Sequence, residues 1–157
     1  MSNRTVRSTS EGMLPAIGIG DSIIIDEHSY QQNKINRFDL VVVKSPRMEA
    51  DGAPPDELLV VKRVVGLPGE NIEIGAGKVF IDGQELNEPF PILNDESEAY
   101  QSFDIRDNEY FLLGDNRPKN EDGRHWKRHS VARSSIIAKV IQIIPSKTTA
   151  PNPVNSK

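Results

Sequence analysis

Short runs of apolar residues recur along the chain, separated by glycine, proline and charged residues. They are rich in Val, Ile and Leu, and each run is short, so they fit strands better than helices. The expected strands occupy residues 21–26, 39–44, 57–65, 70–74, 78–86, 108–116 and 134–144. Within the fifth run, Asp82-Gly83 marks a tight hairpin turn. This pattern predicts a mainly β fold, an antiparallel folded sheet or barrel, rather than alternating βαβ units.

The segments between the strands have a different character. Residues 45–57 are a polar, proline-rich loop, and residues 88–106 are expected to form a surface insertion. Helical periodicity of useful length does not occur in the sequence, although a turn or two is compatible with the residues after Arg117. Residues 146–157 have the composition of a disordered tail. We therefore expect one domain over residues 1–145, followed by that tail.

Composition excludes several function classes. A net charge of −4 without a basic block gives no electrostatic basis for nucleic-acid binding. The absence of cysteine excludes disulfides, thiol nucleophiles and cysteine metal sites. The three histidines, at positions 28, 125 and 129, do not form a metal-ligand pattern, and we expect the last two to be a surface pair. No metal and no other cofactor is predicted.

Three polar stretches carry candidate chemistry. Residues 12–21 form a loop rich in glycine that leads into a strand. Residues 60–70 contain Lys62 as a lone cation in an apolar strand. It either faces solvent or points inward, where burial lowers the pKa of its amine and lets it act as a neutral base. Residues 112–126 contain a Gly-Asp-Asn-Arg turn and further charged residues that can hold loops in place.

In this order, the stretches resemble the type I signal peptidases, membrane-anchored serine endopeptidases that remove signal peptides from exported proteins. The resemblance covers roughly residues 6–145. It rests on four boxes, SEGMLPAIGIGD (10–21), RFDLVV (37–42), KRVVGLPGE (62–70) and GDNRPKNEDGR (114–124). It implies the folded β-sheet of that family and a Ser–Lys dyad, in which a serine attacks the scissile carbonyl and a neutral lysine takes its proton.

The resemblance assigns roles position by position. Lys62 is the expected general base, and Ser10 the residue that stabilises the oxyanion. The nucleophile's position falls on Gly12, which has no hydroxyl group. In the last box, Asn120 replaces the serine that orients the lysine, and Gly123 replaces another serine. The remaining expected structural residues of that box are Asp115, Arg117, Asp122 and Arg124.

Three explanations of Gly12 stay open. The chain is a natural pseudo-peptidase, its serine was replaced deliberately, or Ser10 acts as the nucleophile. If residues 10 and 12 lay on a strand, they would point to the same side about 6.6 Å apart, too far for Lys62 to serve both. Deliberate replacement usually introduces alanine and does not explain Asn120 or Gly123. Changes at two separate catalytic positions therefore favour natural loss of catalysis.

The resemblance also implies a groove in which the end of a signal peptide lies extended along two strands. Shallow pockets in it accept small side chains, as in Ala-x-Ala. The matching positions are Val6, Ser8, Met13, Ile17, Val60 and Val61. For Ile17 and Val61, a place in the core is an open alternative. The expected function is recognition of such peptides without cleavage. The alternatives are an active endopeptidase that uses Ser10 and a non-catalytic scaffold domain.

The expected location depends on a membrane anchor. Family members carry a transmembrane helix just before the first box, whereas eleven residues precede Gly12 here. No apolar run approaches the ~18 residues that such a helix needs. If an anchor has been removed, the expected location is the extracytoplasmic face of a membrane, with the membrane surface as a partner. If the chain is complete, it is the cytoplasm. We expect a monomer that binds a signal peptide and no nucleic acid.

Overall fold

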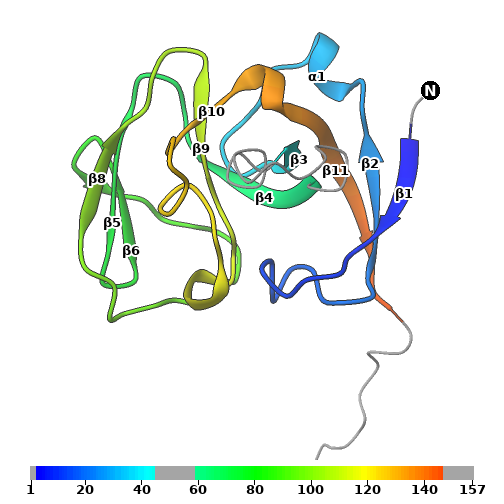
Figure 1. Ribbon diagram of the computed structural model, residues 1–157, viewed down its shortest axis with the longest axis horizontal. Coiled ribbons are helices and arrows are strands. Elements are labelled where there is room, and N and C mark those ends of the chain that lie inside the picture. Colours follow the sequence, from blue (N-terminus) through cyan, green and yellow to red (C-terminus); the bar gives the residue numbers. More distant parts are fainter. Residues whose placement is uncertain (1–2, 45–58, 147–157) are drawn as a thin grey trace, which may run out of the picture.

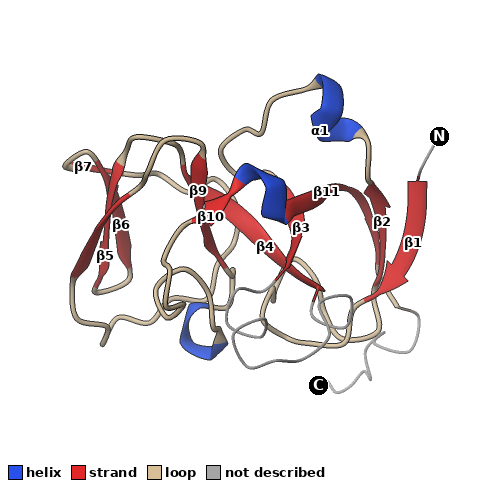
Figure 2. Cartoon of the chain, turned by 45° about the horizontal axis from the view of Figure 1, so that its top comes forward, coloured by secondary structure: helices blue, strands red, loops and turns tan. Residues whose placement is uncertain are grey.

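The computed structural model describes residues 3–44 and 59–146, which form two antiparallel sheets lying side by side (Figures 1 and 2). Across the larger sheet the strands are β1 (Asn3–Arg7), β2 (Ser22–Asp26), β11 (Ile136–Ile144), β3 (Leu40–Lys44), β4 (Leu59–Gly66), β9 (Glu109–Leu113) and β10 (Val131–Ala132). Across the smaller sheet they are β7 (Gln84–Glu85), β6 (Lys78–Ile81), β5 (Asn71–Gly75) and β8 (Gln101–Asp104). Helical structure in these residues comprises α1 (Ser29–Gln32) and the 3-10 turns η2 (Arg117–Lys119) and η3 (Arg133–Ser135).

The larger sheet curls into a half-barrel, and β11 is the strand that bends most visibly (Figure 1). This strand pairs with β2 on one side and with β3 on the other. Its register shifts between Val140 and Gln142 against β2, and between Ile136 and Ala138 against β3. Such irregularities bend a strand and increase its twist. The prediction of a mainly β, antiparallel folded sheet is confirmed.

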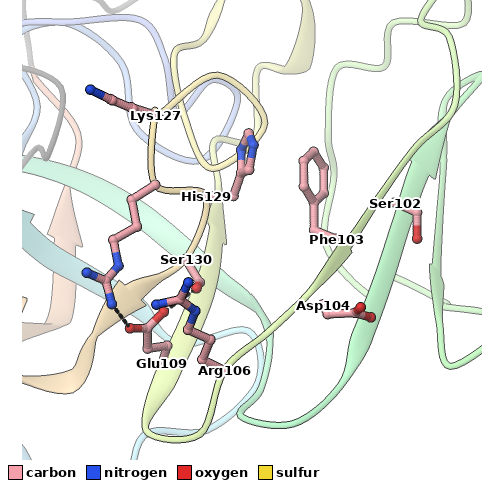
Figure 3. A pocket seen from close by; sticks show the side chains of 9 residues that line it. Ser102, Phe103, Asp104, Arg106, Glu109, Lys127, His129 and Ser130 are labelled. Carbon is pink, nitrogen blue, oxygen red and sulfur yellow. Dashed lines mark hydrogen bonds and ion pairs between the residues drawn. The ribbon is translucent and has the colours of Figure 1, made fainter.

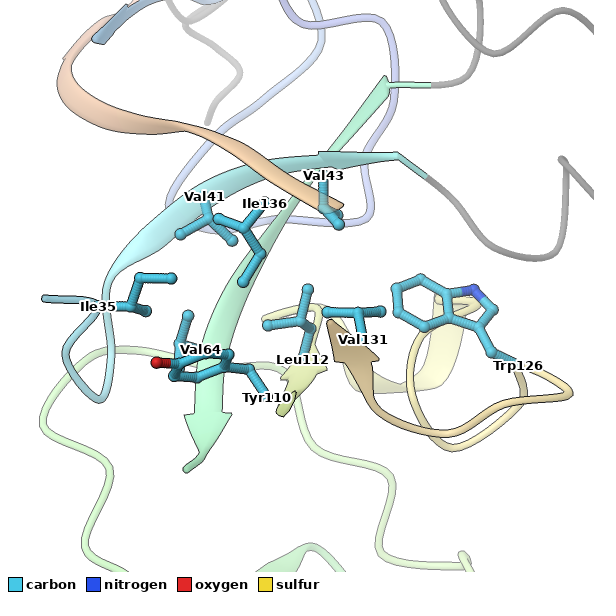
Figure 4. Close-up of a cluster of buried hydrophobic side chains, with 9 residues drawn as sticks. All are labelled: Ile35, Val41, Val43, Val64, Tyr110, Leu112, Trp126, Val131 and Ile136. Carbon is cyan, nitrogen blue, oxygen red and sulfur yellow. The ribbon is translucent and has the colours of Figure 1, made fainter. Parts of the chain in front are cut away.

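The strand β3 shows why apolar runs replace simple alternation in this sequence. Val41 and Val43 belong to the buried cluster in Figure 4, whereas Val42 belongs to the cluster on the opposite face. Both faces of the strand are covered, so every position between its ends is apolar. Successive residues of β9 likewise pack into different hydrophobic clusters on its two faces. Leu112 joins the cluster of Figure 4, and Phe111 packs against the smaller sheet, which joins the two sheets.

All the expected strands occur, with small shifts at their ends, and Asp82-Gly83 forms the turn between β6 and β7. The turn expected after Arg117 is η2. The sequence patterns missed β1, β8, β10 and the single helical turn α1. The edge strand β1 is mostly polar and is paired with β2 through its backbone, so it leaves little hydrophobic signal. The expected loop at 45–57, the start of the expected strand 57–65 and residues 147–157 of the expected tail lie outside the described residues. Ser146, the first residue of that tail, is described, and its N–H donates to Asp21 at 2.9 Å.

The expected surface insertion at 88–106 is more ordered than its composition indicates. Its last part forms β8, which pairs with β5. Its first part is held by two ion pairs, Glu88 with Arg117 at 2.5 Å and Glu98 with Arg124 at 3.0 Å. These ion pairs, together with backbone hydrogen bonds of Leu93 to Asp115 and Arg117, hold the segment against the last box, 114–124. Hydrophobic patterns do not report such contacts. The segment nevertheless stays largely exposed, and its assignment as an insertion stays a prediction.

Candidate functional site

Lys62 lies on β4 where one edge of that strand is open. On one side, β3 pairs with β4 from Leu59 to Arg63. On the other side, β9 pairs with β4 only from Arg63 onward. Within the described residues, the part of β4 before Arg63 therefore has no strand on its second edge. A groove borders this edge, and its other wall consists of the end of β1 and the loop that follows.

The loop between β1 and β2 is tied together at its ends. The N–H of Ser8 donates to the carbonyl of Asp21 at 2.8 Å, and the N–H of Gly20 donates to the carbonyl of Ser8 at 2.9 Å. Gly20 has a φ of 89°, which glycine adopts without steric cost. Met13 and Ile17 are 4% and 1% exposed and fix the first half of the loop in the core.

Ser10 and Gly12 both lie in this loop. The assumption that they share a strand is wrong, because β1 ends at Arg7. The distance argument against Ser10 therefore does not apply. The loop meets the last box directly, since the N–H of Asn116 donates to the carbonyl of Gly12 at 3.0 Å. In Figure 1 the dark-blue loop after β1 accordingly lies next to the yellow turn.

The side chain of Asn120 joins Lys62 to Gly12. Nζ of Lys62 donates to Oδ1 of Asn120, and Nδ2 of Asn120 donates to the carbonyl oxygen of Gly12 at 2.5 Å. The amide suits both partners, because its oxygen only accepts and its nitrogen only donates. It fits here because Gly114 has no side chain, and a Cβ atom there would overlap the amide. Of the two orientations that the sequence left open for Lys62, the structure has the inward one, beside Asn120. The roles of these residues stay predictions.

Burial governs the protonation of Lys62, which is 7% exposed. Removal from water lowers the pKa of its amine below the ordinary lysine value. The carboxylates of Asp122 and Glu121 oppose this shift, and the guanidinium of Arg124 reinforces it. The amine therefore gives up its proton more readily than an exposed lysine does. A general base requires this neutral form.

Asp122 and Arg124 form a buried ion pair. Nε and Nη2 of Arg124 donate to the two carboxylate oxygens of Asp122 at 2.8 and 2.9 Å, and the N–H of Gly114 donates to the same carboxylate at 3.1 Å. Burial alone would raise the pKa of Asp122, but the hydrogen bonds and charge of Arg124 outweigh it and hold that pKa below its usual value. This pair braces the turn that carries Asn120.

Two more ion pairs connect the same turn to the rest of the fold. Nε and Nη2 of Arg63 donate to Asp115 at 2.9 and 2.6 Å, and the guanidinium carbon of Arg63 lies 3.7 Å from the ring centroid of Phe90. Arg117 pairs with Glu88. The sequence singled out Asp115 and Arg117 but missed their partners, which lie in other segments. Among the partners only Arg63 carried a signal, because it is part of the third box.

All six predicted substrate-binding residues line one groove of about 240 Å³. They are Val6, Ser8, Met13, Ile17, Val60 and Val61. Ser10, Gly12 and Lys62 line the same groove, so the predicted catalytic and binding positions come together in space. Met13 and Ile17 also belong to a hydrophobic core cluster. For Ile17, a place in the core and a place in the groove wall are therefore compatible.

A wider cleft of about 760 Å³ lies elsewhere and shares no lining residue with this groove (Figure 3). Arg128 donates to Glu109 at 2.6 Å, and the hydroxyl of Ser130 donates to the other oxygen of the same carboxylate at 2.5 Å. The rings of His129 and Phe103 pack with their centroids 4.3 Å apart. Several of its polar groups thus satisfy one another, and the cleft is not part of the predicted site.

A family model described as signal peptidase, peptidase S26, matches residues 2–144. The chain belongs to this family. It is 31% identical over 132 residues to signal peptidase I of Leptolyngbya laminosa, and the match covers 84% of this chain and 64% of that protein. It is 29% identical over 127 residues to signal peptidase I V of Bacillus subtilis (strain 168), covering 73% and 70%. The chain thus spans less than two thirds of the Leptolyngbya protein.

A crystal structure of a signal peptidase I from Enterococcus faecalis V583 has a similar fold. The TM-score is 0.55 at 27% identity, and the match covers 70% of this chain and 98% of that chain. The curled antiparallel sheet of this chain therefore matches the fold of that signal peptidase I. Within residues 3–44 and 59–146, none of the helices of this family member has the length and apolar character needed to cross a membrane.

Proposed function

We propose that this signal peptidase-like domain recognises extended peptide ends with small side chains and does not cleave them. The observation that carries the proposal is the pairing of a buried Lys62 with Gly12, a residue without a hydroxyl, across the bridging amide of Asn120. Gly12 follows Ser10 by two residues, as the nucleophile does in the first box of the family. Without a nucleophile, an enzyme of this type retains acceleration only from its oxyanion site and binding, on the order of 10³–10⁴ over water.

The groove supports the binding half of the proposal. The open edge of β4 next to Lys62 offers backbone groups to which an extended peptide can add as a further strand. Val60 and Val61 lie on that side, and Met13 and Ile17 form part of the opposite wall. A volume of about 240 Å³ shared along such walls suits small side chains such as alanine.

The second candidate is a peptidase that uses Ser10. Its hydroxyl oxygen lies 3.8 Å from where a Cβ atom on Gly12 would be, and Ser10 lines the groove together with Lys62. Against this candidate, the hydrogen bond that Lys62 makes within the described residues goes to Asn120, not to Ser10. A scaffold role without any peptide is the third candidate.

Direct measurement of binding and cleavage separates these candidates. The purified protein is titrated into a fluorescent peptide that ends in Ala-x-Ala, and anisotropy reports binding while mass spectrometry reports cleavage. We expect binding, with turnover no faster than in the variant Lys62→Ala. Turnover that disappears in both Lys62→Ala and Ser10→Ala would establish the second candidate. Absence of both binding and cleavage by the unmodified protein would leave the scaffold role as the remaining candidate.

A matched pair of variants tests whether the groove is the binding site. Val60→Asp places a charge in the groove wall and is expected to weaken binding. Ile141→Asp makes the same kind of change at an apolar residue that is 46% exposed on β11 and does not line the groove. It is expected to bind like the unmodified protein. Equal loss in both variants would contradict the assignment.

The site of action belongs to the same proposal. Signal peptidase I proteins are associated with membranes, and their substrates are signal peptides. We therefore place this domain, as a monomer, at the extracytoplasmic face of a membrane with a signal-peptide end in its groove. Sedimentation velocity and fractionation of cells that express the protein test the two statements separately.

A further inference from the structure

Lys62 lies where two cavities meet. Its side chain lines the groove of about 240 Å³ and also a more open cleft of about 470 Å³ on the side of Asn120. Ser10, Gly12 and Val60 line both cavities as well. A small molecule that enters from either side therefore meets the same amine, although the residue itself is buried from bulk water.

The hydrogen bonding of Lys62 leaves the lone pair of its neutral amine without a donor in the part of the chain that the structure describes. Within the described residues, Nζ takes part in one hydrogen bond, as the donor to Oδ1 of Asn120. No described group donates to Nζ, and Gly12 has no hydroxyl that would do so. In a Ser–Lys dyad the lone pair of the neutral amine accepts the proton of the serine. Here that lone pair has no proton to accept.

Burial and the charges around Lys62 together shift its amine toward the neutral, reactive form. Burial, the largest effect, and Arg124 lower the pKa of Lys62, while Asp122 and Glu121 act in the opposite direction. The net direction is downward, so the neutral form is more populated near neutral pH than for an exposed lysine. Neutral lysines desolvated in apolar pockets are the ones that form Schiff bases with carbonyl compounds.

We propose that Lys62 is a nucleophile in its own right and condenses with a small aliphatic aldehyde or ketone in this groove. Nζ attacks the carbonyl carbon and forms a C–N bond, and a proton moves from nitrogen to oxygen to give a carbinolamine. The C–O bond then breaks as the nitrogen lone pair forms the C=N bond, and the hydroxyl leaves as water with the remaining proton of the nitrogen. The product is a neutral imine, which water can hydrolyse back to the amine and the carbonyl compound. No oxidant or reductant is required. The proposal does not rest on peptide binding.

The walls of the groove indicate the class of carbonyl compound. Met13, Ile17, Val60 and Val61 contribute apolar surface to the groove that Lys62 also lines. The other charged residues of its lining are Arg4, which is paired with Glu27, and Arg7. An unbranched alkyl chain gains from contact with such surface, whereas a charged chain loses its hydration there. We therefore expect butanal to react faster than glyoxylate, a small aldehyde that carries a carboxylate.

Reductive trapping tests the proposal on the full chain. The protein is incubated at about pH 7 with butanal and cyanoborohydride, which converts an imine into a stable secondary amine, and modified lysines are located by peptide mass spectrometry. Lys78, exposed on β6, serves as the internal reference. An ordinary lysine with a pKa of about 10.4 is almost entirely protonated at this pH. We expect Lys62 to be modified at least about tenfold faster than Lys78.

A variant without the amine and two comparisons within the unmodified protein serve as controls. In Lys62→Met the fast modification is expected to vanish while that of Lys78 is unchanged, with circular dichroism to confirm folding. Modification of Lys62 no faster than Lys78 in the unmodified protein would overturn the proposal, and this result does not depend on any variant. Faster reaction with glyoxylate than with butanal would overturn the assignment of an aliphatic ligand. The outcome also leaves the peptide-binding proposal untouched, because no peptide is present.

Discussion

A Cβ atom on Gly12 would lie 2.9 Å from Nδ2 of Asn120. Folded proteins are too closely packed to tolerate such an approach, so a side chain at position 12 would displace either the amide or the loop. The same amide donates to the carbonyl of Gly12 and accepts from Lys62. Glycine at position 12 and asparagine at position 120 are therefore a matched pair, in which the small residue makes room for the large one.

This relationship predicts how catalysis can be restored. Gly12→Ser alone is expected to give little peptidase activity, because the new side chain collides with the amide that holds Lys62. Gly12→Ser combined with Asn120→Ser removes the collision and supplies a hydroxyl to orient the amine. We expect the double variant to cleave an Ala-x-Ala peptide at least about tenfold faster than the single variant, the effect of one well-placed hydrogen bond. Equal rates would contradict the matched pair.

The sequence predicts some parts of this structure better than others for physical reasons. The strand β3 is buried on both faces, so its valines identify it directly. The strand β1 is paired through backbone groups, which every residue has, and its polar side chains hide it. The boxes place Lys62 and Asn120 in one site, but spacing along the chain does not reveal that the amide also reaches Gly12. That contact depends on the room left by Gly114, which only three-dimensional packing shows.

Removal of the Asn120 side chain is expected to destabilise the fold. Asn120→Ala leaves the buried amine of Lys62 without its hydrogen-bond acceptor, whereas the carbonyl of Gly12 loses one of its two donors and keeps the N–H of Asn116. An unsatisfied buried polar group costs about 1–3 kcal/mol, and we expect a loss of this size in the free energy of unfolding measured with urea. Lys119→Ala, at a neighbouring side chain that is 72% exposed, serves as the control and is expected to change it by less than about 0.5 kcal/mol. Similar values for both variants would show that the amide bridge contributes nothing to stability.

The ion pair of Arg63 with Asp115 is expected to contribute more to the free energy of unfolding than the exposed pair of Arg4 with Glu27. The side chains of the first pair are 10% and 0% exposed, and those of the second are 51% and 38% exposed. Asp115→Asn leaves a buried guanidinium without its counter-charge and is expected to cost about 3–5 kcal/mol. Glu27→Gln is expected to cost less than about 1 kcal/mol. Urea denaturation of both variants measures the difference, and a cost for Asp115→Asn as small as for Glu27→Gln would contradict this assignment.

The lowered pKa of Lys62 predicts a pH dependence of stability. In the unfolded chain a lysine has a pKa of about 10.4, and in the folded chain burial holds that of Lys62 lower. Between these two values the unfolded state binds more protons, so the contribution of Lys62 to the free energy of unfolding rises with pH. Below the folded pKa, the folded protein carries the full cost of a buried ammonium.

Methionine at position 62 keeps the apolar stem and removes this titration. The stability of Lys62→Met relative to the unmodified protein is therefore expected to be most favourable at the lowest pH of the window and to decline as the pH rises toward about 10.4. Urea denaturation at a series of pH values measures the difference. Lys78→Met, at an exposed position on β6, corrects for the general loss of a surface charge. A Lys62→Met difference that runs parallel to the Lys78→Met difference at every pH would mean that Lys62 titrates like a solvated lysine. The neutral amine required by both the general-base role and imine formation would then be lost.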